Sequence, residues 1–280
     1  MPVASERVYS TTISLMTEFL INGPSGPIAG SCIGDGPCLM LVAGLGATRS
    51  LWGELPGLLA KTFTVVTLDN RGIGGSRGGL PFTADGAAED VWTVLDHLGH
   101  QTTALLGASL GGLVVLRAAL TRPNRVNRMV IASTAARLTT HGRRSIGLLR
   151  DMLEHFPPEV FGRSLMTLGF GPPFHRRLPG FVDQTAQAYG LDPKDVPGCL
   201  AQAEHMLEGW DDRKALESLQ VPALVLAGQR DNVVAWEDTA EISEALSRAL
   251  FVLAPDAGHS VLAEGGKDVF DRVVSFLEAV

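Results

Sequence analysis

Short apolar runs alternate along this chain with longer segments in which apolar residues recur at helical spacing. Most of the short runs contain no charged residue, which is typical of strands buried on both faces of a parallel sheet. We therefore predict an α/β fold with a mainly parallel sheet flanked by helices. The predicted strands are Ile28 to Ile33, Cys38 to Ala43, Phe63 to Asp69, Thr102 to Gly107, Arg128 to Ser133, Pro222 to Gly228 and Leu250 to Ala254. The predicted helices lie near Trp52 to Lys61, Thr83 to Leu98, Leu110 to Thr121, Glu237 to Ser247 and Gly266 to Ala279.

The alternation stops between Ala135 and about Arg213, where helical patterns continue but no convincing strand occurs. Proline pairs punctuate this stretch, as expected at helix boundaries. We interpret it as a helical cap inserted into the α/β core. The predicted division is residues 1–135 for the first part of the core, 136–213 for the cap and 214–280 for the second part of the core.

A G-x-S-x-G motif centred on Ser109 lies between a predicted strand and a predicted helix. A nucleophilic serine needs such a strand–turn–helix arrangement, because its Oγ must project from a sharp and strained turn. The glycines at 107 and 111 remove side chains that would collide at that turn. By itself the motif also fits an ordinary glycine-rich turn, but its context favours a nucleophile.

Two further polar residues follow later strands at their carboxyl ends, where open α/β sheets place their sites. Asp231 comes just after the run ending at Gly228, and His259 comes just after the run ending at Ala254. The order serine, aspartate, histidine predicts a triad in which His259 is the general base and Asp231 orients it. Asp256 is the alternative acid, although its place three residues before His259 is more typical of a turn former.

Backbone N–H groups are expected to stabilise the oxyanion that such a triad creates. We predict that Leu110, directly after the nucleophile, supplies one of them. Leu45 is predicted to supply the other, since Gly44-Leu45-Gly46 follows a strand and allows close backbone approach. A plain glycine turn is the alternative reading of this segment.

These motifs resemble the α/β-hydrolase superfamily over nearly the whole chain. The resemblance rests on the serine motif, on the late Asp231 and His259, and on the run from Asp69 to Ser76, which is similar to the family's D-x-R-G-x-G-x-S loop. That loop's aspartate and arginine are structural in the family. One departure is Ala43-Gly44, where many members have His-Gly. Within the superfamily, three features look most like oxoadipate enol-lactonases and related esterases: Gly44-Leu45-Gly46-Ala47, Trp52 and Ala132-Ser133-Thr134-Ala135-Ala136.

Composition narrows the partners and the location. The net charge of −7 disfavours nucleic acid and anionic membranes as partners, because either needs a basic face. The three cysteines lack metal-ligand spacing, so neither a disulfide framework nor a metal site is expected. The N-terminal segment up to Ile21 contains charged residues and no apolar stretch of signal-peptide length, and the expected location is the cytoplasm.

The predicted cap is rich in large apolar residues and in arginine. We predict that Trp52 of the core and Phe170, Met206 and Trp210 of the cap line a substrate pocket. Other apolar cap residues are candidates for the same lining: Phe156, Phe161, Met166, Phe174 and Phe181. The arginines of the cap could include a carboxylate clamp: Arg137, Arg143, Arg144, Arg150, Arg163, Arg176 and Arg177.

The sequence therefore predicts a cofactor-free serine hydrolase that cleaves an ester, lactone or thioester of a small to medium apolar acid. Two alternatives remain open. The same residues can support carbon–carbon bond hydrolysis, perhydrolysis or a lyase reaction, or the fold can serve as a non-catalytic receptor for a small molecule. Dehalogenase and epoxide hydrolase chemistry is disfavoured, because Ser109 stands where those members of the fold have a nucleophilic aspartate.

Overall fold

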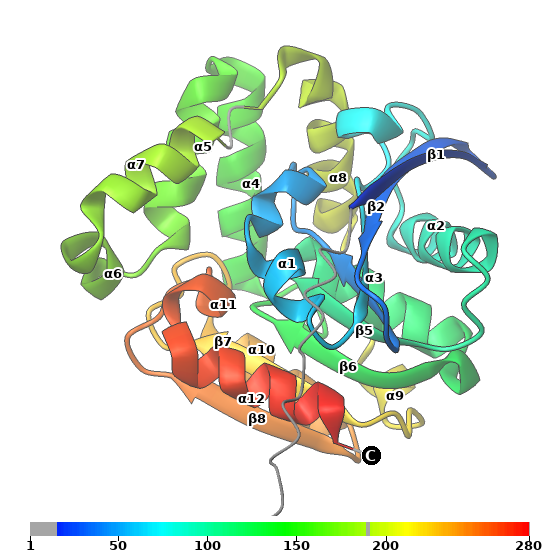
Figure 1. Cartoon of the computed structure of the whole chain (residues 1–280). Helices are drawn as coiled ribbons and strands as arrows, with labels where there is room; N and C mark the ends of the chain where they lie inside the picture. Colours follow the sequence, from blue (N-terminus) through cyan, green and yellow to red (C-terminus); the bar gives the residue numbers. More distant parts are fainter. Residues whose placement is uncertain (1–15, 189–190, 280) are drawn as a thin grey trace, which may run out of the picture.

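The chain is described here by a computed structural model that covers residues 16–188 and 191–279 (Figure 1). Within these residues, strands form one sheet in the order β1-β2-β4-β3-β5-β6-β7-β8. From β4 to β8 all neighbouring strands are parallel, and β2 and β1 extend one edge in antiparallel pairing. The predicted mainly parallel sheet is confirmed. The strands are β1 (Thr17–Gly23), β2 (Gly26–Ile33), β3 (Cys38–Val42), β4 (Thr64–Leu68), β5 (Thr103–Ala108), β6 (Val126–Ala132), β7 (Ala223–Gly228) and β8 (Ala249–Ala254).

The apolar runs are uninterrupted because helices cover both faces of the sheet. In β3, Leu39 and Leu41 pack into one apolar cluster and Met40 into the other, and all three are fully buried. Burying such a side chain contributes roughly 1.5–3 kcal/mol. The first cluster receives helices α1 (Leu55–Leu59) and α12 (Gly266–Glu278). The second receives α2 (Ala84–His97), α3 (Leu110–Thr121) and α10 (Trp236–Ala245).

The segment between β6 and β7 is helical and lies over one end of the sheet (Figure 1). An isolated antiparallel bridge between Arg137 and Asp211 brings its two ends together. We refer to its α-helices α4 to α8 as the cap helices. They are α4 (Thr140–His155), α5 (Pro158–Gly169), α6 (Pro172–Arg177), α7 (Pro179–Ala188) and α8 (Val196–Glu208).

Three elements differ from the sequence-based expectation. Strand β1 was not predicted, since it lies at the sheet edge and its residues are mostly exposed. The helix predicted from Trp52 to Lys61 is split into a 3-10 turn, η1 (Arg49–Trp52), and the short α1. Gly53, with φ at +52°, ends the first piece, and Pro56 is the second residue of the second piece. A short helix, α11 (Val261–Glu264), follows the predicted histidine.

In residues 16–188 and 191–279, no helix combines the length and the apolar character that a membrane crossing requires. The N-terminal segment that we interpreted as unlike a signal peptide lies outside the described residues as far as residue 15.

Candidate active site

Ser109 occupies a sharp turn between β5 and α3. Its backbone has φ 55° and ψ −124°, a conformation that residues other than glycine rarely adopt. The flanking glycines make this turn possible: a Cβ on Gly107 would lie 2.3 Å from the Gly111 carbonyl oxygen, and one on Gly111 would lie 2.0 Å from the Val42 carbonyl oxygen. Close packing therefore enforces the strained turn, and Ser109 lines a pocket at the carboxyl end of the sheet.

Asp231 and His259 meet above neighbouring strands. The Nδ1 atom of His259 lies 2.8 Å from Oδ2 of Asp231, and the exposed fractions of the two side chains are 12% and 2%. Oδ1 of Asp231 accepts hydrogen bonds from the backbone N–H groups of Val233 and Val234, at 2.8 and 2.9 Å. Three hydrogen bonds thus hold the Asp231 carboxylate and orient the His259 ring.

The loops that carry these two residues are in backbone contact. A Cβ on Gly228, at the end of β7, would lie 2.1 Å from the carbonyl oxygen of Gly258. Arg230 N–H also donates to the carbonyl oxygen of Ala257 at 2.8 Å. Asp256, the alternative acid, is exposed on the same loop, and the hydrogen bond from His259 goes to Asp231 instead.

The protonation of His259 depends on opposing effects. Burial lowers the pKa of this imidazole, whereas the charge of Asp231, the hydrogen bond to Asp231 and the charge of Glu264 raise it. The sum raises the pKa of His259 above its ordinary value of 6.5. A raised pKa makes the neutral ring a stronger proton acceptor, provided that the pH is high enough to keep it neutral.

The predicted oxyanion donors lie on either side of Ser109. Leu110 is the first residue of α3, where backbone N–H groups have no partner within the helix. The loop that holds Leu45 approaches from β3, and a Cβ on Gly44 would lie 3.2 Å from the Ser109 Cβ. The structure thus places both predicted segments beside the serine.

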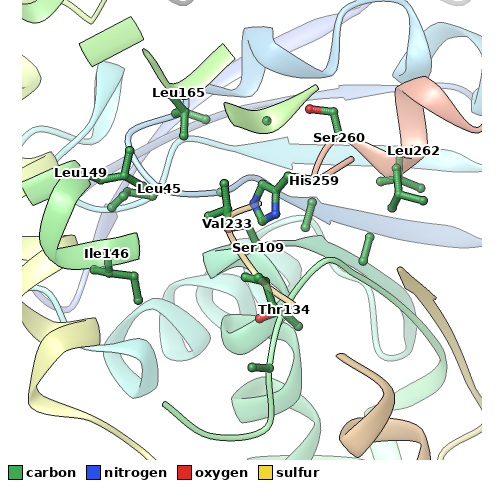
Figure 2. Close-up of a pocket in the computed structure, with 18 of the residues that line it drawn as sticks. Leu45, Ser109, Thr134, Ile146, Leu149, Leu165, Val233, His259, Ser260 and Leu262 are labelled. Carbon is green, nitrogen blue, oxygen red and sulfur yellow. The ribbon is translucent and has the colours of Figure 1, made fainter. Parts of the chain in front are cut away.

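A pocket of about 260 Å³ opens between the sheet and the cap helices. Figure 2 shows Ser109 and His259 in its wall, with leucine and isoleucine side chains of the cap helices opposite. The four residues that we predicted to line a pocket, Trp52, Phe170, Met206 and Trp210, all line this one. Sequence reasoning missed further apolar lining residues, among them Ile146, Leu149, Val233 and Leu262. Nothing in their spacing separates them from ordinary core positions.

Some of the other residues proposed from the cap line the pocket and others do not. Met166 and Phe181 line the pocket, whereas Phe156 is exposed and both Phe161 and Phe174 are buried elsewhere in the core. Among the seven arginines considered for a carboxylate clamp, Arg137 alone belongs to the pocket lining. Its Nε and Nη2 atoms already donate to both carboxylate oxygens of Glu241, at 2.8 and 2.6 Å. The pocket wall formed by the described residues is therefore largely apolar.

Glu264 is a buried carboxylate beside the site that the sequence did not single out. It ends α11, is 5% exposed, and its Oε2 accepts a hydrogen bond of 2.7 Å from the backbone N–H of Gly171 in the cap. Burial raises its pKa, and the nearby N–H groups of Gly258 and Gly171 offset only part of that effect. Its partners are distant in the sequence, and a glutamate in an amphipathic helix gives no signal of such a role.

Metal-ligand types are dispersed in the described part of the chain. Histidine, cysteine, aspartate and glutamate side chains do not gather there in groups of three or more that could hold a metal ion.

Comparison with known proteins gives concordant results. Residues 37–266 match the protein family described as alpha/beta hydrolase fold. A protein of Pseudomonas savastanoi pv. phaseolicola named putative carbamate hydrolase RutD is 28% identical over 228 residues, which are 81% of this chain and 88% of that protein. The 3-oxoadipate enol-lactonase 2 of Acinetobacter baylyi is 28% identical over 208 residues, 73% of this chain and 75% of that one.

A solved structure shows the same architecture. The crystal structure of the enol-lactonase from Burkholderia xenovorans LB400 superposes with a TM-score of 0.82 at 22% sequence identity, covering 93% of this chain and 100% of the other. At that identity the likeness concerns the fold.

Proposed function

The chain belongs to the α/β-hydrolase fold family, and from that premise we propose that it is a serine hydrolase that cleaves an ester, lactone or thioester through an acyl-enzyme. The observation that carries the proposal is the 2.8 Å hydrogen bond between His259 and Asp231 in the wall of the pocket that also exposes the strained Ser109. A hydroxyl is a weak nucleophile at neutral pH, so an oriented base in the same pocket supports covalent catalysis.

The proposed reaction uses these residues as follows. His259 Nε2 takes the proton of Ser109 Oγ as that oxygen attacks the substrate carbonyl carbon, and the carbonyl oxygen becomes an oxyanion facing the N–H groups of Leu45 and Leu110. When the tetrahedral intermediate collapses, the bond to the leaving group breaks and His259 returns the proton to it. Water then attacks the acyl-enzyme with His259 again as base, which releases the acid and regenerates Ser109.

Asp231 keeps the proton of His259 on Nδ1, so that Nε2 has its lone pair available for Ser109. The same carboxylate stabilises the imidazolium that forms in each proton transfer. The raised pKa of His259 reflects this stabilisation.

The substrate class follows from the pocket. Leucine, isoleucine, methionine and aromatic side chains form most of its wall, and the guanidinium of Arg137 is engaged by Glu241. An acyl group without charge therefore fits better than one that carries a second carboxylate. We propose that the cap helices select it, since Phe170, Met206 and Trp210 come from that segment.

Other functions are candidates for the same residues. The named carbamate hydrolase relative supports carbamates as substrates, because a carbamate carbonyl is open to the same attack. Carbon–carbon bond hydrolysis, perhydrolysis and lyase reactions also use a triad of this kind, and a receptor would bind without turnover.

The test combines turnover with active-site labelling. Purified protein is assayed on a panel of chromogenic esters, lactones, thioesters and carbamates of graded acyl length, in parallel with Ser109→Ala. A fluorophosphonate probe should modify Ser109 in the wild type, as identified by peptide mass spectrometry, and should not modify the variant. Tight binding of a panel compound with neither turnover nor labelling would point to the receptor instead.

A further inference from the structure

The loop that follows β3 is held at both ends by buried amide side chains. Asn70 Nδ2 donates a hydrogen bond of 2.9 Å to the carbonyl oxygen of Ala43, at the start of the loop. At the other end, the backbone N–H of Gly46 donates a hydrogen bond of 2.9 Å to Oε1 of Gln202. Asn70 is 1% exposed and Gln202 is 0% exposed, so both contacts are shielded from solvent.

Gln202 reaches this loop from the cap. It lies on α8 and also donates from Nε2 to the carbonyl oxygen of Arg71 at 3.3 Å. The helix is seated by direct backbone contact, because a Cβ on Gly198 would lie 2.0 Å from the carbonyl oxygen of Gly72. One buried side chain thus connects a cap helix to two loops at the carboxyl end of the sheet.

The loop needs such support because its own backbone is permissive. Gly44 and Gly46 flank Leu45, and Gly46 has φ at +66°, a region that glycine enters without cost. Within the loop, the backbone bond from Ala47 N–H to the Gly44 carbonyl oxygen is 3.2 Å long. Donors that stabilise a transition state must already be in place when charge develops, so restraint of this loop bears directly on rate.

We propose that Gln202 and Asn70 are positioning residues for the oxyanion loop, so that a cap helix completes the alignment of the transition-state donors. The proposal rests on the function proposed above, and neither side chain touches substrate. Docking of α8 then does more than close the pocket, because Gln202 holds the Gly46 end of the oxyanion loop while Asn70 holds its Ala43 end.

The central test is Gln202→Met, which keeps the length of the side chain and removes both hydrogen bonds. We expect kcat to fall about 10- to 100-fold with KM changed by less than about threefold, because the loss is confined to the transition state. A boronic acid that forms a tetrahedral adduct with Ser109 should lose affinity by a similar factor. Gln202→Glu, which retains an acceptor for the Gly46 N–H, should recover part of the lost kcat.

A matched control separates positioning from general docking of the helix. His205 lies on the same α8 and accepts a hydrogen bond of 3.0 Å from the backbone N–H of Ala84 on α2, not from the oxyanion loop. His205→Leu should lower the melting temperature but leave kcat within about twofold of the wild type. Equal kcat losses in the two variants would overturn the proposal.

Amide hydrogen exchange measured by NMR tests the hydrogen bond between Gly46 and Gln202 in the unaltered protein. The Gly46 N–H should exchange slowly, and Gln202→Met should accelerate it. Rapid exchange of Gly46 in the wild type would overturn the proposal even if a variant failed to fold. Failure of the proposed serine hydrolase function can be told apart from failure of this positioning proposal. In the first case the wild-type protein itself shows neither turnover nor labelling of Ser109, before any variant of Gln202 is made.

Discussion

Replacement of Asp231 by asparagine tests the triad most sharply, because the backbone dictates how the new side chain must lie. In the wild type, Oδ1 accepts from the N–H groups of Val233 and Val234, and Oδ2 faces Nδ1 of His259. An asparagine satisfies the two backbone donors only with its single oxygen on their side. Its NH₂ group then points at Nδ1 of His259.

The expected loss follows from this orientation. An NH₂ donor facing Nδ1 favours the His259 tautomer that carries its proton on Nε2, and that tautomer cannot accept a proton from Ser109. The removal of the Asp231 charge also withdraws stabilisation from the imidazolium. Triads with the wrong tautomer lose about 10⁴-fold in kcat, which corresponds to about 5 kcal/mol of transition-state stabilisation.

The assay is kcat and kcat/KM on a chromogenic ester at a pH where the wild type is fully active. Asp256→Asn is the matched control, because this exposed carboxylate lies three residues from His259 on the same loop and should have little effect. Circular dichroism checks that both variants fold. Retention of more than about a tenth of wild-type kcat by Asp231→Asn, or a larger loss in Asp256→Asn, would refute the assignment of the acid.

Four further outcomes are expected. Ser109→Ala should lose about 10⁴-fold or more in kcat while still binding substrate, and near wild-type turnover would remove the nucleophile. Activity should fall as the pH drops through the raised pKa of His259, so the acid limb of kcat/KM should have its midpoint above 6.5, and a midpoint below that value would contradict the electrostatics. Glu264→Gln removes a charge that raises this pKa and should move the midpoint to lower pH; an unchanged midpoint would deny the coupling. Gly111→Ala should lower the free energy of unfolding by about 2–3 kcal/mol and the melting temperature by several degrees, because its Cβ would collide with backbone atoms. Gly147→Ala, whose Cβ would meet open space, should instead stabilise α4, and calorimetry measures both effects.

The sequence alone was sufficient for the fold class and for the order of the candidate triad. Apolar runs without charge predict a sheet covered on both faces, and the match to the α/β-hydrolase family confirms that prediction. The turn at Ser109 is local, because the strand, the glycines and the helix are adjacent in the chain. Their pattern can therefore be recognised without knowledge of tertiary contacts. Asp231 and His259 were predicted because parallel strands end at one edge of the sheet, and the structure brings the two side chains into hydrogen-bond contact.

The pattern of apolar and polar residues did not predict some secondary-structure elements correctly. Strand β1 is exposed at an edge, where side chains need not be apolar. The helix expected from Trp52 is interrupted, because a glycine at positive φ and the following proline change the backbone direction locally. Periodicity averages over such single residues and therefore overestimates the length of a helix.

The pocket and its supports were decided by tertiary structure alone. Gln202 meets Gly46 across 156 positions, and Glu264 meets Gly171 across 93. Buried polar groups are stable only when paired, but the sequence does not reveal which distant N–H group will be the partner. The order of residues along the chain and local sterics thus determined the fold class and the candidate chemistry. The packing of the cap helices onto the sheet determined what surrounds Ser109, because contacts between remote segments form only in the folded chain.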